Sequence, residues 1–223
     1  MPLDAVCFDL DDTLYRYEKY ARAGLHAAAD YLESETGYRL REELLALYFD
    51  RERTTGTFDH VVERHDLSES HVERLVEAFH SASTPLSPYP GTERVLDTLA
   101  PAYRLGLITD GREGLAKLDR LGITDRFDEI LVTPRIDSSK HEPGVFERVL
   151  GELGVRPERA MYVGDDPRVD LPVPNNLGMW TVRLRRGRYA ALEPQSPDAE
   201  PDYRIESIDA LPAVVRDCDG SDR

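Results

Sequence analysis

The chain has 223 residues, of which 43 are acidic and 28 are basic, so its formal net charge is −15. This balance argues against nucleic acid or an anionic membrane as a partner. A hydrophobic content of 40% allows one large domain, or a core with a smaller unit.

Lysine is scarce among the basic residues. Only Lys19, Lys117 and Lys140 are lysines, and the others are arginines. An acidic, lysine-poor composition is typical of proteins from salt-loving archaea, and we expect a halophilic protein, with a GC-rich genome as the alternative. The two cysteines, Cys7 and Cys218, form no disulfide framework, and no apolar run reaches the ~18 residues of a membrane span. We therefore expect a cytoplasmic location.

The first predicted element is a buried strand near the N-terminus. The run AVCFDL at 5–10 is continuously apolar up to its carboxylate, which is typical of a strand covered on both faces. Apolar residues with helical spacing follow in three stretches, at 17–32, 40–48 and 72–79. This pattern predicts a helical insert over residues 15–86, with a Pro- and Ser-rich linker at 83–91.

From residue 92 onward, predicted helices alternate with predicted strands. The strands are expected at 103–109, 128–133, 160–164, 180–184 and 203–207. Helices are expected at 92–100, 112–122 and 143–154, while the last residues, with Cys218, read as a frayed polar tail. Alternation of this kind predicts an α/β fold, a doubly wound Rossmann-like parallel sheet that carries the helical insert.

Polar residues follow three of these strands at the point where each one ends. Ligands of open parallel sheets bind beyond the carboxyl ends of the strands, so we expect the polar residues to meet at one edge. They are Asp9, Asp11 and Thr13 after the first strand, Thr109 and Asp110 after the second, and Asp165, Asp166 and Asp170 after the fourth.

Adjacent carboxylates in a crevice stay ionised together only if a cation lies among them. An all-oxygen ligand set suits Mg²⁺. We predict a magnesium site built from Asp9 and Asp165 with the backbone carbonyl of Asp11. Asp170 is predicted to hold the waters of the metal, and Asp166 is a further candidate for that outer position.

Four motifs in order resemble the haloacid dehalogenase-like hydrolases, a superfamily dominated by phosphatases. DLDDT at 9–13 matches its D-x-D-x-T motif, and LITDG at 107–111 resembles the second motif. KHEPGVF at 140–146 resembles the lysine motif, and VGDDPRVD at 163–170 matches G-D-x-x-x-x-D. The resemblance implies that the insert is a small helical cap at 15–86, and that residues 1–14 and 87–223 form the catalytic core.

The roles that the resemblance implies agree with the chemistry of the residues. Asp9 would attack phosphorus and form an aspartyl-phosphate, while Asp11 would serve as general acid and then general base. Thr109 and the backbone N–H groups of Asp110 and Gly111 would bind the transferring phosphoryl group.

Two further residues complete the predicted site. Lys140 would neutralise charge between the phosphoryl group and Asp9, and Thr13 would shape its turn through a local hydroxyl bond. The chain departs from the family at His141, which stands where a proline is usual, and at Pro172 and Pro174, which predict a short or late helix.

The expected activity is Mg²⁺-dependent hydrolysis of a small phosphorylated metabolite. A phosphomutase and a haloacid dehalogenase remain alternatives within the same superfamily. A phosphoacceptor signalling module of the receiver type is an alternative outside it. The substrate and the choice between monomer and homodimer are left open.

Overall fold

The computed structural model describes residues 2–51 and 53–220, and the chain divides into two compact units. One unit contains the residues up to Arg16 together with those from Leu86 onward, and the other contains Tyr17–Pro85. The assignment of the insert as a cap stays a prediction.

The larger unit is built on a six-stranded sheet in which every neighbouring pair is parallel. Its strands are β1 (Ala5–Phe8), β2 (Arg104–Thr109), β3 (Glu129–Val132), β4 (Ala160–Gly164), β5 (Trp180–Leu184) and β6 (Tyr203–Ile205). The spatial order is β3-β2-β1-β4-β5-β6. The predicted α/β fold with a doubly wound parallel sheet is therefore confirmed.

The strand order places a switch point between β1 and β4. The chain runs outward from β1 through β2 to β3, then returns to the other side of β1 at β4. Phe8 pairs with Val163 on β4 and with Leu107 on β2, and the Asp9 N–H donates to the Val163 carbonyl at 2.9 Å. The three strands therefore end almost level with one another, which brings the residues that follow them together.

Helices cover the sheet because the strands are apolar on both faces. The helices of this unit are α5 (Thr92–Leu99), α6 (Gly114–Leu121), α7 (Pro143–Leu153), α8 (Pro172–Leu177) and α9 (Leu211–Asp219). Single 3₁₀ turns lie at Thr124–Arg126, Thr133–Ile136, Pro157–Arg159, Gly187–Tyr189, Pro197–Ala199 and Ile208–Ala210.

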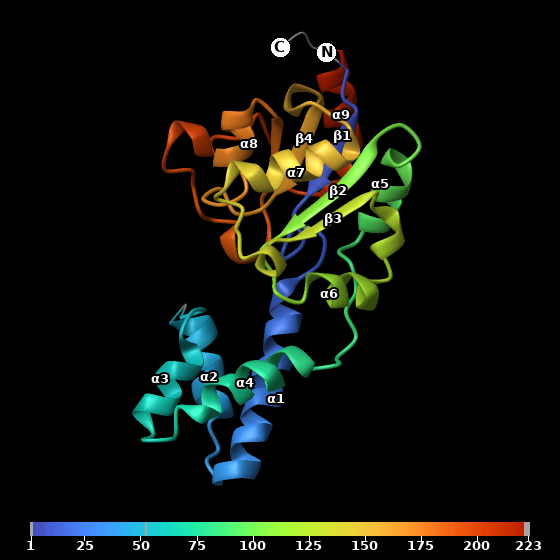
Figure 1. Ribbon diagram of the computed structural model, residues 1–223. Helices are drawn as coiled ribbons and strands as arrows, with labels where there is room; N and C mark the ends of the chain where they lie inside the picture. The colour runs from blue at the N-terminus through green and yellow to red at the C-terminus, as the bar shows by residue number, and fades with distance from the viewer. Residues whose placement is uncertain (1, 52, 221–223) are drawn as a thin grey trace. The chain divides into compact units, whose positions relative to one another are not determined.

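Helix α7 lies against one face of the sheet (Figure 1). Its buried Phe146 packs edge to face on Tyr162 of β4, within a core cluster that also contains Cys7 and Ile108. This packing joins β1, β2 and β4 through one apolar cluster. Helix α8 has only six residues, and both of its prolines lie at or near its start, as the sequence predicts.

The smaller unit consists of helices. They are α1 (Tyr17–Thr36), α2 (Arg41–Leu45), a π-helical turn (Ala46–Asp50), α3 (Thr57–Arg64) and α4 (Ser70–Ser81). Tyr20 of α1 packs edge to face on Phe79 of α4 and bonds His80 at 2.8 Å. Gly24 permits this packing, because a Cβ there would lie 2.5 Å from the Phe79 ring.

The expectation of a polar tail is wrong for the part that contains Cys218, while the last residues, 221–223, lie outside the described residues. Residues 211–219 form helix α9 instead of a frayed tail, and Leu211, Val215 and Cys218 are buried. The side chain of Asp219 accepts hydrogen bonds from the Leu3 N–H and the Tyr103 hydroxyl. The spacing of the three buried residues is helical, but the many acidic residues around them conceal it.

Candidate active site

Three carboxylates and one lysine meet at the carboxyl edge of the sheet. One oxygen each of Asp9, Asp165 and Asp170 lies within 4.8 Å of the others, and all three side chains are buried. The Lys140 ammonium donates to Asp9 Oδ1 at 2.7 Å and to Asp170 Oδ1 at 2.6 Å. Residues that follow β1, β3 and β4 thus form one charged cluster at the switch point.

The cluster contains more carboxylates than ammonium groups. Burial disfavours the charged form of Lys140, but the carboxylates of Asp170 and Asp9 outweigh it and raise its pKa well above the usual value. Burial raises the pKa of Asp9 to about 7, although Lys140 opposes the shift. One ammonium therefore compensates the three buried carboxylates only in part.

Asp165 is the least compensated member of the cluster. Burial, followed by the charges of Asp170 and Asp9, raises its pKa well above the ordinary range. Its Oδ2 is buried and has no hydrogen-bond partner among the described residues. A buried carboxylate oxygen in this situation fits a cation ligand, and Asp9, Asp165 and Asp170 are the oxygen donors available.

Thr13 connects the two loops that carry these carboxylates. Its hydroxyl donates to Asp165 Oδ1 at 3.4 Å, across 152 residues of sequence. The expected local hydroxyl bond is not what the structure shows, because Thr13 is fully buried and its hydroxyl faces the loop after β4. Thr13 therefore orients Asp165 from the first loop.

Asp170 holds the loop after β4 in place. Its Oδ2 accepts the N–H groups of Asp165 and Asp166, at 3.1 and 2.9 Å. Gly164 permits this arrangement, since a Cβ at that position would lie 2.4 Å from the Asp170 carboxyl carbon. The contact explains why the motif contains glycine at 164 and aspartate at 170. Whether Asp170 also holds metal-bound water stays a prediction.

The residues after β2 are held by hydrogen bonds within the site. Thr109 is buried, and its hydroxyl accepts the Gly111 N–H at 3.1 Å. The Asp110 carboxylate accepts the Thr133 hydroxyl at 2.5 Å and the Lys140 N–H at 3.1 Å. The side chain of Asp110 thus ties the β2 loop to the Lys140 segment, and the predicted phosphoryl contacts from backbone N–H groups stay predictions.

Asp11 lies outside the cation cluster, with partners of its own. The Lys117 ammonium donates to both of its oxygens, at 2.8 Å each, and the Tyr15 hydroxyl donates to Oδ1 at 2.6 Å. Burial alone would raise the pKa of Asp11, but Lys117 and then Tyr15 lower it below the usual value. The predicted contribution of the Asp11 carbonyl to a metal site stays a prediction.

Arginines fix the outer side of the site. Asp166 accepts both the Nε and the Nη2 of Arg168, at 3.0 and 2.9 Å, so an ion pair already engages its carboxylate. Arg188, in the loop after β5, donates to buried Asp12 at 2.6 Å. Arg186 donates to the backbone carbonyls of Asp12 and Thr13. Asp12 has a left-handed backbone with φ of 63°, and this loop supports that turn.

Sequence reasoning missed several of these residues. Lys117, Arg186 and Arg188 are in no motif, and their roles depend on how α6 and the loop after β5 pack. The scarcity of lysine is the one signal that could have found Lys117. Of the three lysines, two are buried and bound to the carboxylates at 9 and 11.

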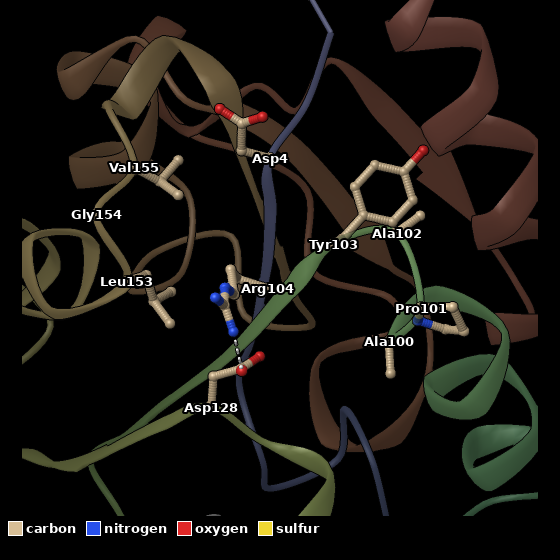
Figure 2. A pocket seen from close by; sticks show the side chains of 10 residues that line it. All are labelled: Asp4, Ala100, Pro101, Ala102, Tyr103, Arg104, Asp128, Leu153, Gly154 and Val155. Atoms are coloured by element: carbon tan, nitrogen blue, oxygen red, sulfur yellow. Dashed lines mark hydrogen bonds and ion pairs between the residues drawn. The ribbon is translucent and has the colours of Figure 1, made fainter.

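A separate pocket lies at the opposite edge of the sheet (Figure 2). Its lining includes Asp4 before β1, Arg104 at the start of β2 and Asp128 before β3. Arg104 pairs with Asp128 at 2.9 Å, and Asp128 also accepts the Leu105 N–H. The Asp128 carboxylate is thus engaged by groups at the start of β2.

The fold and site define an α/β enzyme with a carboxylate at the end of its central strand, paired with a buried lysine. A family model described as haloacid dehalogenase-like hydrolase matches residues 3–178. The chain belongs to this family, as its motifs predict.

Relatives and solved structures support the assignment. A glyceraldehyde 3-phosphate phosphatase of Methanopyrus kandleri is 35% identical, over 96% of this chain and 98% of its own. A ribulose-1,5-bisphosphate 5-phosphatase of Halopiger xanaduensis is 32% identical, over 95% and 98%. The crystal structure of a phosphatase of the same family from Thermococcus onnurineus has a TM-score of 0.69 at 26% identity, over 96% and 98%.

Proposed function

We propose that the protein is a Mg²⁺-dependent phosphatase that hydrolyses a small phosphate monoester through an aspartyl-phosphate. The observation that carries the proposal is the contact between Asp9 and Lys140 beside the buried, unpartnered oxygen of Asp165. Together they provide a nucleophile, a cation that neutralises phosphate charge and a ligand for a hard metal ion. Asp11, two residues after the nucleophile, supplies a separate group for proton transfer.

Each residue has one task in the proposed reaction. Asp9 attacks phosphorus, and the ester P–O bond breaks as the new Asp9 O–P bond forms. Thr109 and Lys140 stabilise the charge of the transferring group. When bound by Asp9 and Asp165, with the Asp11 carbonyl as a further ligand, Mg²⁺ would supply further neutralisation of phosphate charge. The leaving oxygen takes up one proton, which Asp11 passes to it from solvent.

The second half of the reaction returns the enzyme to its starting state. Water attacks phosphorus, the Asp9 O–P bond breaks, and Asp11 accepts the proton from the water. Asp11 then returns this proton to solvent, because Lys117 and Tyr15 hold the pKa of its carboxyl group below the usual value. The sum is one ester and one water converted to one alcohol and one phosphate.

We infer that the substrate is a small sugar phosphate. Several relatives that match nearly all of this chain are named for glyceraldehyde 3-phosphate, and one is named for ribulose 1,5-bisphosphate. Glyceraldehyde 3-phosphate is the first compound to test.

No helix among the described residues has both the length and the apolar character of a membrane span. The expected cytoplasmic location, the salt adaptation and the oligomeric state stay predictions.

The function is tested by phosphate release from a panel of phosphorylated metabolites with 5 mM Mg²⁺, in low salt and in molar KCl. We expect turnover of one or more triose or pentose phosphates, and loss of turnover with EDTA that added Mg²⁺ restores. Release of halide from 2-haloacids without phosphate release would favour the dehalogenase alternative. Transfer of the phosphoryl group within the sugar, without free phosphate, would favour a phosphomutase.

Mg²⁺ is expected to raise the melting temperature, and more so at higher pH. Because burial raises the pKa of Asp9 to about 7 and that of Asp165 well above its usual value, the folded state holds protons that the unfolded state releases. Without metal, this stabilisation is complete below about pH 4 and is lost as pH rises through about 7. Mg²⁺ replaces those protons, so the increase in melting temperature should grow between pH 5 and 8.

Differential scanning fluorimetry with and without 10 mM Mg²⁺ checks this expectation. Asp165→Asn should abolish the metal-dependent increase, whereas Asp137→Asn, at an exposed position, should preserve it. An increase of equal size in Asp165→Asn would remove Asp165 from the metal site.

A further inference from the structure

Lys117 is a buried lysine that the proposed reaction does not use. It lies on α6, which follows β2, and only 2% of its surface is exposed. Burial of an ammonium group is costly unless an anion pairs with it. Lys117 has such a partner in Asp11, and its Nζ lies 2.8 Å from each carboxylate oxygen.

The surroundings are shaped to bring these two groups together. A Cβ at Gly111 would lie 2.8 Å from Lys117 Nζ and 2.9 Å from Asp11 Oδ2, so a larger residue would occupy the space where they meet. On the other side, the Tyr15 hydroxyl bonds Asp11 Oδ1 at 2.6 Å. Helix α6, the β2 loop and the first loop therefore meet at one carboxylate.

Each of the two buried lysines pairs with different carboxylates of the site. Lys140 contacts Asp9 and Asp170, and Lys117 contacts Asp11. Among the described residues, the group of carboxylates close enough to share a cation includes Asp9 but not Asp11. Lys117 thus holds the Asp11 carboxylate outside the group of carboxylates that could share a cation.

We propose that Lys117 is a positioning residue, which orients the Asp11 carboxylate to accept a proton from the water that hydrolyses the aspartyl-phosphate. This inference rests on the proposed function. In that step water forms a bond to phosphorus, the Asp9 O–P bond breaks, and the proton of the water goes to Asp11. Both oxygens of Asp11 are held by donors, so its plane is fixed before the water arrives. Loss of one donor lets the carboxylate turn away.

The test compares the rate of Asp9 phosphorylation with the rate of phosphoenzyme hydrolysis, with p-nitrophenyl phosphate as the substrate. Its leaving group needs little protonation, so phosphorylation of Asp9 should be nearly unaffected in Lys117→Met. Hydrolysis of the phosphoenzyme should slow by about 10- to 100-fold, as general base catalysis contributes about 10²–10⁴-fold in total. Rapid mixing should show a burst of p-nitrophenol of one equivalent per enzyme, and acid quenching should recover the phosphoenzyme.

Further variants distinguish a positioning role of Lys117 from a structural effect or a substrate contact. Tyr15→Phe, which removes the second donor, should show the same burst with a smaller slowing. In the Asp11→Asn background, Lys117→Met should change kcat by less than about 3-fold, because effects transmitted through one residue are not additive. Lys19→Met, at an exposed lysine, is the matched control and should behave as wild type.

Several outcomes would overturn the inference. A Lys117→Met enzyme that is slowed in phosphorylation, or that raises KM with kcat unchanged, would show that Lys117 contacts the substrate. If the wild-type enzyme turns over but neither Lys117→Met nor Tyr15→Phe shows a burst, the role of Lys117 as a positioning residue is contradicted. The proposed phosphatase function would not be affected by that result. Absence of phosphatase activity and of phosphoenzyme in wild type would instead refute the proposed function.

Discussion

Asp9→Asn is expected to abolish turnover while the fold stays intact. An amide cannot attack phosphorus to form an acyl phosphate, so kcat should fall by at least about 10⁴-fold. The change is almost isosteric, and Lys140 keeps Asp170 as its partner at 2.6 Å. Since burial raises the pKa of Asp9 to about 7, removing its charge should leave the metal-free melting temperature equal or higher.

Phosphate release and thermal unfolding of the same preparation check this result. Asp137→Asn is the matched control, because Asp137 is exposed and its left-handed backbone suits asparagine. A fully active Asp9→Asn enzyme would remove Asp9 from the role of nucleophile. An inactive variant with a strongly lowered melting temperature would mean that Asp9 is needed mainly for the fold.

Lys140→Met is expected to damage both activity and stability. It removes the one ammonium that contacts Asp9 and Asp170. Loss of one partner from a buried ion pair costs about 3–5 kcal/mol of unfolding free energy. Loss of charge neutralisation should lower kcat by about 10³-fold. The stability deficit should grow with pH, because the pKa of Asp9 is already raised to about 7 and more carboxylate charge is then unpaired.

Urea unfolding at pH 5 and pH 8 without metal measures the deficit. Lys19→Met controls for the loss of a lysine at an exposed site. Lys140→Arg keeps the charge and should recover part of the stability, but little of the activity, because the guanidinium is larger and planar. Equal deficits at both pH values would contradict the proposed electrostatic origin.

The sheet and the positions of the acidic residues were predictable from the sequence. Continuous apolar runs such as AVCF and AMYVG correspond to buried strands β1 and β4, since a strand covered on both faces has no polar side. The chain places Asp9 and Asp165 directly after those strands. Parallel strands end at one edge, so their proximity follows from topology without knowledge of side-chain packing.

The partners of these residues were not predictable in the same way. Lys117 reaches Asp11 only because α6 packs beside the first loop and Gly111 leaves space, and neither condition is visible in a local pattern. Thr13 bonds Asp165 across 152 residues instead of its own turn, because burial turns its hydroxyl toward the neighbouring loop. Such contacts depend on where elements pack, whereas sequence periodicity reports only which face of an element is apolar.

The turn that follows Asp9 is held by two arginines from near the C-terminal end of the chain. Arg186 and Arg188 bind Asp12 and the carbonyl of Thr13, yet they lie beyond residue 178, where the family match stops. During translation, the turn after Asp9 is synthesised early. Its hydrogen bonds to Arg186 and Arg188 form only after most of the chain has been made. A shortened chain that ends at residue 178 would keep the four motifs and still lack two side chains that hold the turn after Asp9.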